Sequence, residues 1–200
     1  MKFYQTSLNN HPDGLCILLI LFGCSEGCSY CFNKESWKEY SPPFEIYKEI
    51  IDKSPIIDNF VLGGNNILDD KNKTLTKLLC TYLKEKNKNV SLQINIKSLR
   101  NNINFLQELP FNHIRLSING AWYSDIPIIE KLSNMPIKMT NILVYDDEGR
   151  IVIPENINID EIIVNYDKPY LYDVAKKFAE IHKVEYLISK EFGKEQVYIV

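Results

Sequence analysis

The sequence predicts an α/β fold, an open and curved partial barrel of the (β/α)6 type with a parallel sheet. Short apolar segments typical of buried strands alternate with segments whose apolar residues recur every three and four positions, as in amphipathic helices. Strands separated by helices imply parallel crossover connections. The 200 residues hold five or six such units, too few for a complete eight-fold barrel of about 250 residues.

The first expected strand is the continuous apolar run at residues 15–22, which is typical of a strand buried on both faces. Residues 1–14 are expected to be a lead-in ending in a dense turn signal, with His11 as a solvated loop residue. Further strands are expected at 59–62, 90–96, 113–118, 137–144 and 161–164, and two weaker candidates at 185–188 and 196–200 would pair at an edge. Helices are expected at 44–53, 73–86, 99–109, 126–133 and 170–182.

Composition and charge indicate one domain, residues 1–200, and argue against several classes of partner. An apolar content of 45% is enough for a single core. The net charge of -3, from 23 basic and 26 acidic side chains, provides no general attraction to nucleic acid or to an anionic membrane. The longest apolar stretch is much shorter than the about 20 residues that span a bilayer, and it follows no charged secretory leader. A cytoplasmic protein is therefore expected.

Cysteine usage favours a metal site over a disulfide framework. Five cysteines are an odd number, and Cys24, Cys28 and Cys31 lie within eight positions directly after the first expected strand. Thiolates are the usual ligands of iron–sulfur clusters, and a cubane of four irons held by only three cysteines leaves one iron open to a small molecule. The alternative is a structural zinc site, which requires four ligands, and no fourth Cys or His lies nearby in the sequence. Cys16 and Cys80 are expected to be small buried hydrophobes.

Two unusual loops are expected at the same end of the sheet. The cysteine loop, residues 24–31, and the segment 63–66 each follow an expected strand, and ligands of parallel α/β sheets bind at the carboxyl ends of the strands. Gly63 and Gly64 lack a Cβ atom, so they permit a positive φ and a close approach of the backbone to a ligand. The alternative for this pair is a tight turn between strand and helix.

The Cys-x3-Cys-x-aromatic-Cys pattern of the cysteine loop, followed by Gly63-Gly64, resembles the radical S-adenosylmethionine (SAM) superfamily. The resemblance implies the fold of that family and a [4Fe–4S] cluster held by Cys24, Cys28 and Cys31. The open iron would bind the amino and carboxylate groups of SAM. One electron would then cleave the sulfonium, and the resulting 5′-deoxyadenosyl radical would abstract a hydrogen atom.

The resemblance also implies which residues contact SAM. Tyr30, in the aromatic slot before the third cysteine, and the backbone around Phe32 would line the adenine. Asn65 replaces the acid that usually receives the methionine ammonium in this family. An amide oxygen accepts that hydrogen bond without the charge assistance that roughly doubles its strength, so weaker SAM binding is predicted. The candidates for contact with the ribose lie at strand ends: Ser117 and Asn119, with Gln93 or Asn95 on the preceding strand. No catalytic side chain beyond the cluster ligands is expected.

The run from Cys28 to Trp37 resembles the Cys-x-x-Cys-[Phe/His]-Asn-x-x-[Ser/Thr]-Trp run of glycyl-radical-enzyme activases, and is most similar to the activating protein of anaerobic ribonucleoside-triphosphate reductase. This implies an oxidoreductase that generates a glycyl radical on the anaerobic ribonucleotide reductase, with an electron from an external flavodoxin-like donor. Trp37 is equally well interpreted as a packed loop aromatic. The alternatives are a radical SAM synthase acting on a small molecule, similar to 7-carboxy-7-deazaguanine synthase, and a non-catalytic iron–sulfur or zinc-binding protein of the same fold.

Overall fold

The computed structural model describes residues 3–8, 10–27, 31, 34–118, 125–145, 160–165, 176, 180, 185–189 and 196–199. Within these residues the strands form one nine-stranded sheet, in which each strand lies beside its neighbour in sequence. The strands are β1 (Tyr4–Ser7), β2 (Cys16–Leu21), β3 (Asn59–Gly64), β4 (Asn89–Asn95), β5 (His113–Ser117), β6 (Lys138–Tyr145), β7 (Glu161–Asn165), β8 (Glu185–Ser189) and β9 (Gln196–Ile199).

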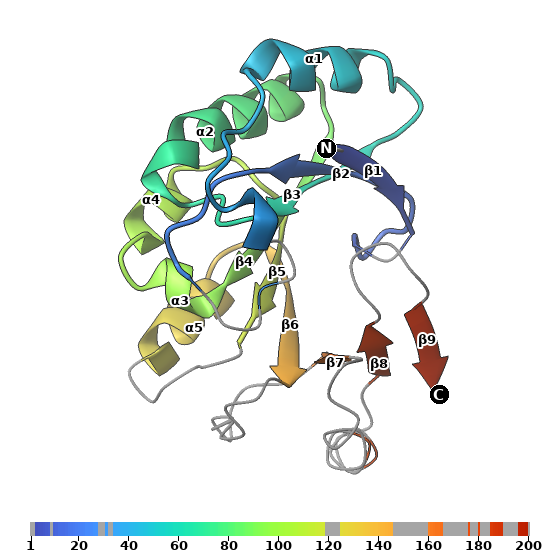
Figure 1. The fold of residues 1–200 in the computed structure, drawn as a ribbon, viewed down its shortest axis with the longest axis vertical. Coiled ribbons are helices and arrows are strands. Elements are labelled where there is room, and N and C mark those ends of the chain that lie inside the picture. Colours follow the sequence, from blue (N-terminus) through green and yellow to red (C-terminus); the bar gives the residue numbers. More distant parts are fainter. Residues whose placement is uncertain are drawn as a thin grey trace.

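The described strands from β2 to β8 pair in parallel, whereas β1 and β9 are antiparallel strands at the two edges. The predicted α/β fold with an open, mostly parallel sheet is confirmed. The two weaker strand candidates near the end of the chain are also confirmed, because β8 and β9 pair with each other at one edge. Figure 1 shows the sheet curving from β1 to β9, with helices gathered along one of its faces.

The α-helices with described bounds are α1 (Phe44–Asp52), α2 (Asp70–Glu85), α3 (Ile96–Leu99), α4 (Ile103–Gln107) and α5 (Ile126–Ser133). A short 3-10 helix, η1 (Lys34–Ser36), lies between β2 and α1. The single helix expected at 99–109 is wrong, because the chain turns between α3 and α4. α3 ends at Leu99, and Asn102 holds the turn that follows: its backbone N–H donates to the Leu99 carbonyl at 3.0 Å and its side-chain amide donates to the Ser98 carbonyl at 2.7 Å. The helix expected at 170–182 lies largely outside the described residues. No helix in the described part of the chain has the length and apolar content needed to span a bilayer.

The sheet has two chemically different faces. Alternate residues of β2 to β5 pack under the helices in the main apolar core, which includes Leu19, Phe60, Leu62, Leu92 and Leu116. The other residues of β4 and β5 form a polar inner face. Three cross-strand pairs make up that face: Ser91 opposite His113, Gln93 opposite Arg115 and Asn95 opposite Ser117.

The connection between β1 and β2 covers the amino-terminal ends of the strands. Asn10 accepts a hydrogen bond from Arg115 at 2.7 Å, and Asp13 forms an ion pair with Lys138 at 3.2 Å. His11 is only 5% exposed and its ring lies 5.8 Å from that of His113, so the prediction of a solvated His11 is wrong. The expectation that residues 1–14 precede the first strand is wrong for Tyr4–Ser7, which form β1. Its four residues alternate between exposed and half-buried at a sheet edge, a pattern too short to identify from sequence.

Candidate functional site

The cysteine loop leaves the carboxyl end of β2 through a glycine. Gly23 has a φ of +83°, and a Cβ atom there would lie 2.9 Å from the Glu39 carbonyl oxygen, so no larger residue fits. The loop then runs beside residues 34–37, which we term the return segment. Two backbone hydrogen bonds join the two: Gly23 N–H donates to the Ser36 carbonyl at 3.0 Å, and Cys24 N–H donates to the Trp37 carbonyl at 3.1 Å. The cysteine loop is therefore closed at its base.

Both described cysteines of the loop accept N–H hydrogen bonds at sulfur. The backbone N–H of Glu26 donates to Cys24 Sγ at 3.5 Å, and the indole N–H of Trp37 donates to Cys31 Sγ at 3.2 Å. Both cysteines are half-buried. The other predicted residues of this loop lie outside the described part of the chain: Cys28, Tyr30 and Phe32. Within the described residues, no three His, Cys, Asp or Glu side chains come together as a metal-binding group.

Asp69 joins the cysteine loop to α2. One carboxylate oxygen accepts the Ser25 backbone N–H at 3.0 Å and also the Ser25 hydroxyl, while the other caps α2 by accepting the Lys71 N–H at 3.1 Å. Burial opposes ionisation of Asp69, but the hydrogen bonds from Ser25 and Lys71 outweigh it and lower the pKa of the carboxyl below its usual value. The ionised side chain therefore holds Ser25 against the N-terminus of α2.

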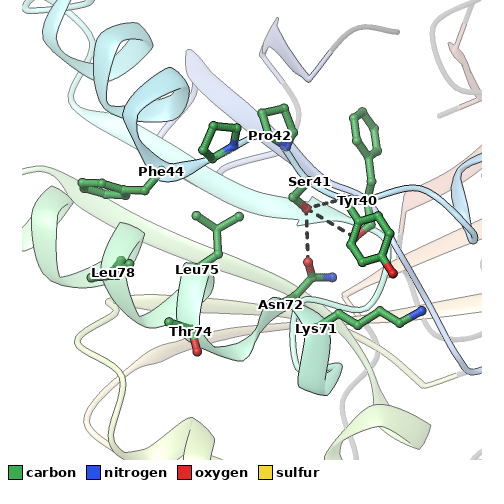
Figure 2. Close-up of a pocket in the computed structure, with 11 residues that line it drawn as sticks. Tyr40, Ser41, Pro42, Phe44, Lys71, Asn72, Thr74, Leu75 and Leu78 are labelled. Atoms are coloured by element: carbon green, nitrogen blue, oxygen red, sulfur yellow. Dashed lines mark hydrogen bonds between the residues drawn. The ribbon is translucent and has the colours of Figure 1, made fainter.

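A second set of polar contacts holds both ends of the connection between β2 and α1, residues 22–43. The Asn72 side-chain amide donates to the carbonyl oxygens of Gly23 at 3.1 Å and Asn66 at 2.9 Å. Its oxygen accepts from the Ser41 hydroxyl at 3.1 Å, and Ser41 in turn accepts the Phe22 N–H at 2.8 Å. Figure 2 shows Ser41 and Asn72 facing each other beside a shallow groove of about 280 Å³. The groove lies between residues 40–44 and α2, and none of the predicted site residues lines it.

The glycine pair packs β3 closely against its neighbours. Gly64 has a φ of +99°, and a Cβ atom there would lie 2.7 Å from Ile20 Cγ2 and 2.9 Å from the Leu21 carbonyl oxygen. A Cβ atom on Gly63 would lie 2.8 Å from Gln93 Oε1. Each glycine therefore has a packing requirement of its own, and the expected approach of their backbone to a cofactor stays a prediction.

Asn65 lies against the return segment. Its side-chain amide nitrogen donates to Ser36 Oγ at 2.8 Å and to the Ser36 carbonyl at 3.2 Å. The residue is 8% exposed, and its side-chain oxygen is buried without a hydrogen-bond partner among the described residues. An amide oxygen in this state can accept a donor from a bound molecule, since a buried acceptor without a partner is costly. The predicted role of Asn65 toward the methionine ammonium uses this atom.

The candidates for the ribose occupy the ends of β4 and β5. Ser117 is half-buried and pairs with Asn95, whose side-chain oxygen accepts the Lys97 N–H at 2.8 Å and so caps α3. Gln93 Oε1 is buried without a partner among the described residues. Asn119 lies outside the described part of the chain. The sheet register therefore brings Ser117 and Asn95 together, and their roles toward a cofactor stay predictions.

Sequence reasoning missed an ion pair at the carboxyl ends of β4 and β5. Arg100 donates through Nε and Nη2 to the two carboxylate oxygens of Asp125, both at 2.8 Å, and Asp125 is 1% exposed. The Asp125 hydrogen bonds raise the pKa of Arg100, with a smaller contribution from the Glu26 carboxylate of the cysteine loop. Glu26 also accepts a hydrogen bond from Asn66 at 3.1 Å. No motif signals these contacts, because they join residues 25 and 40 positions apart.

Three further titratable groups, His113, Cys16 and Cys80, are buried in the inner face or the core. Burial lowers the pKa of His113 to about 4, and its ring bridges Ser91 at 2.6 Å and Thr140 at 2.9 Å. Cys16 and Cys80 are fully buried, as expected, and burial raises the pKa of their thiols to about 11 and about 12. Thiols in such apolar surroundings remain protonated at neutral pH.

A comparison with protein-family models matches residues 18–138, more than half of the chain, to the radical SAM superfamily. The chain belongs to the radical SAM superfamily. Members of this superfamily generally bind a [4Fe–4S] cluster and SAM, and the assignment indicates an enzyme of radical chemistry. The matched range includes the cysteine loop and the glycine pair. No curated protein matches the chain.

The described residues of this radical SAM protein fit the cluster and SAM. Cys24 and Cys31 are half-buried at the carboxyl end of the parallel sheet, and both sulfurs accept N–H donors, which is an environment that tunes cluster-ligating thiolates. The buried oxygen of Asn65 has no hydrogen-bond partner among the described residues, so it is available to accept a donor. Among the described residues no further Cys or His joins Cys24 and Cys31, and the third cysteine of the loop, Cys28, lies outside them.

Proposed function

We propose that this radical SAM protein reductively cleaves SAM at a [4Fe–4S] cluster and generates a glycyl radical on a partner enzyme, the anaerobic ribonucleotide reductase. The contact between Trp37 and Cys31 is the observation that carries the proposal. Trp37 closes the run that resembles the activases, and its indole N–H donates to Cys31 Sγ at 3.2 Å. The residue that distinguishes this run is therefore in contact with a cluster ligand, which supports a role beyond loop packing.

The cysteines and their neighbours have distinct tasks in this proposal. The thiolates of Cys24, Cys28 and Cys31 hold the cluster, and N–H donors at the sulfurs offset part of its negative charge. When bound, the cluster and SAM supply a one-electron cleavage that starts hydrogen-atom abstraction. The electron comes from an external flavodoxin-like protein, and the reducing conditions of the cytoplasm keep the thiols available.

The proposed SAM contacts surround the cysteine loop. The buried side-chain oxygen of Asn65 accepts a hydrogen bond from the methionine ammonium. The glycine pair brings the β3 backbone next to the methionine end of SAM. Tyr30 and Phe32 line the adenine. Ser117 and Asn119 reach the ribose.

A second candidate is a radical SAM synthase that acts on a small polar molecule. The polar inner face favours it, because Gln93 Oε1 is buried there without a partner among the described residues, next to Arg115 on β5. A substrate with an N–H or O–H group would satisfy that acceptor. Under this candidate the hydrogen donor is a small molecule rather than the main chain of a protein.

Anaerobic reconstitution tests the shared part of both candidates. The chain should bind about four irons and four sulfides, and reductant with SAM should release 5′-deoxyadenosine. Replacing Cys24, Cys28 or Cys31 by Ala should abolish both results, whereas the matched control Cys80→Ala should retain them because that thiol is a core residue. Zinc in place of iron, or a cluster without cleavage of SAM, would contradict the proposal and favour the non-catalytic alternative.

The partner is tested by electron paramagnetic resonance after incubation with the anaerobic reductase. A glycyl radical on the reductase, absent with Cys24→Ala, is the expected result. Cleavage of SAM without that radical would instead favour the small-molecule synthase.

The role of Asn65 is tested by SAM affinity. Asn65→Glu should bind SAM more tightly, because a carboxylate adds charge assistance to the hydrogen bond from the ammonium. Unchanged affinity would contradict the assignment of Asn65 to the cofactor.

A further inference from the structure

The nitrogen atom of the Asn65 side chain has a task that an acidic residue cannot perform. It donates to two oxygens of Ser36, the hydroxyl at 2.8 Å and the main-chain carbonyl at 3.2 Å. A carboxylate has no hydrogen to donate to a carbonyl oxygen. Asn65 also donates its backbone N–H to the Leu21 carbonyl at 3.0 Å. One residue therefore connects the ends of β2 and β3 to the return segment.

Ser36 is the point at which the return segment is held. Its carbonyl oxygen accepts the N–H groups of Gly23 at 3.0 Å and Glu39 at 3.2 Å, in addition to the amide of Asn65, and the residue is 6% exposed. The next residue, Trp37, contacts the cysteine loop twice. Its carbonyl accepts the Cys24 N–H, and its indole donates to Cys31 Sγ.

We propose that Asn65 is a positioning residue for the cluster: its amide fixes Ser36, and thereby keeps the Trp37 indole N–H on the sulfur of Cys31. A hydrogen bond to a ligating sulfur stabilises the more negative, reduced cluster and raises its reduction potential. Asn65 thus raises the reduction potential of the cluster through its contact with Ser36 and the position of Trp37. This inference rests on the proposed function only for the identity of the metal group.

The positioning role and the SAM-binding role use opposite ends of one side chain. The amide nitrogen contacts Ser36, whereas the amide oxygen is the acceptor proposed for the methionine ammonium. Asn65→Asp separates the two roles because the side chain keeps its size, gains a charged acceptor and loses both donors. SAM affinity should not fall in this variant, whereas the reduction potential of the cluster should.

The first test measures the reduction potential of the reconstituted cluster. Trp37→Phe removes the indole N–H but keeps an aromatic ring, and should make the reduced state about tenfold less favourable, a shift of about 59 mV to more negative potential for one electron. Asn65→Asp should shift the potential in the same direction. The double variant should shift it by less than the sum, since both changes remove the same contact. Asn104→Asp, at an exposed position of α4, is the matched control and should leave the potential unchanged.

An unchanged potential in Asn65→Asp, or fully additive shifts in the double variant, would overturn the proposal.

A second measurement covers variants that do not assemble a cluster. The chain has two tryptophans, so Trp122→Phe leaves Trp37 as the sole indole emitter. In this background, without metal, both Cys31→Ala and Asn65→Asp should change the emission of Trp37, and Asn104→Asp should not.

The metal-free measurement distinguishes the two proposals. If Trp37 emission responds to Asn65→Asp but no iron–sulfur cluster forms, the link from Asn65 through Ser36 to Trp37 stands, whereas the proposed function and the effect on a cluster potential fail. If the cluster forms and cleaves SAM but neither emission nor potential responds, the proposed function stands and the positioning role fails.

Discussion

The two loops at the candidate site acquire their structure in different ways. The loop between β3 and α2, residues 65–69, is short and is held by its own backbone and by the Asp69 cap of α2. The connection between β2 and α1, residues 22–43, is much longer and carries the cysteines. Four side chains at or near the short loop hold this connection, and they belong to Asn65, Asn66, Asp69 and Asn72.

The difference shows that contacts from the short loop help to hold the described part of the cysteine loop. A long connection loses conformational entropy on folding, and the regular structure described within this one is a single turn of 3-10 helix, Lys34–Ser36. Hydrogen bonds from the short loop add to the contacts between the cysteine loop and the return segment. Changes in the short loop should therefore disturb the cysteine loop, and the following predictions test that dependence.

The largest effect is expected from Gly64→Ala. The added Cβ would lie within 3 Å of both Ile20 and the Leu21 carbonyl, at a φ of +99°, so we expect a loss of about 3 kcal/mol in the free energy of unfolding. Gly14→Ala is the matched control, because its φ is +91° but nothing lies within 4 Å of the new Cβ, and it should lose only about 1 kcal/mol. Equal losses in urea unfolding would show that close packing of β3 against β2 is not important.

A smaller effect is expected from Asp69→Ala, which removes both the cap of α2 and the contact to Ser25. The loss should be about 2 kcal/mol. Asp69→Asn keeps the capping oxygen but presents an NH2 group to Ser25, so it should retain roughly half of that stability. Hydrogen exchange at the Ser25 amide should become faster in both variants. If exchange changed only in Asp69→Ala, the cap rather than the contact to the loop would hold Ser25.

The smallest effect is expected in how the free energy of unfolding falls at low pH. Hydrogen bonds hold the pKa of Asp69 below its usual value of 3.8 in the folded state, so the unfolded chain binds the proton more readily. The stabilisation by this carboxylate is thus fully present above pH 3.8 and is lost as the pH falls through the lower, folded-state pKa. Unfolding measured from pH 6 downward should show a shallower acid loss for Asp69→Asn than for the unmodified protein. Identical slopes would contradict the role of the ionised Asp69.

Several parts of the fold and site could be predicted because their signal is local. Apolar runs bounded by turn residues predicted the strands from β2 to β8, and the spacing of the cysteines predicted the radical SAM superfamily. The split between α3 and α4 could not be predicted, because it depends on the Asn102 side chain bonding to a carbonyl rather than to solvent. The burial of His11 was missed for a similar reason, since only the folded chain places it against His113.

The sequence by itself determined the alternation of strands and helices, the cysteine spacing and the membership of the radical SAM superfamily, because each is a property of neighbouring residues. Only the tertiary structure decided what holds the cysteine loop in place. Asp69 meets Ser25 across 44 positions and Asn65 meets Ser36 across 29, and neither pair forms a pattern along the chain. Such contacts exist because parallel pairing of β2 and β3 brings the carboxyl ends of both strands to one edge, so the loops that follow them lie side by side.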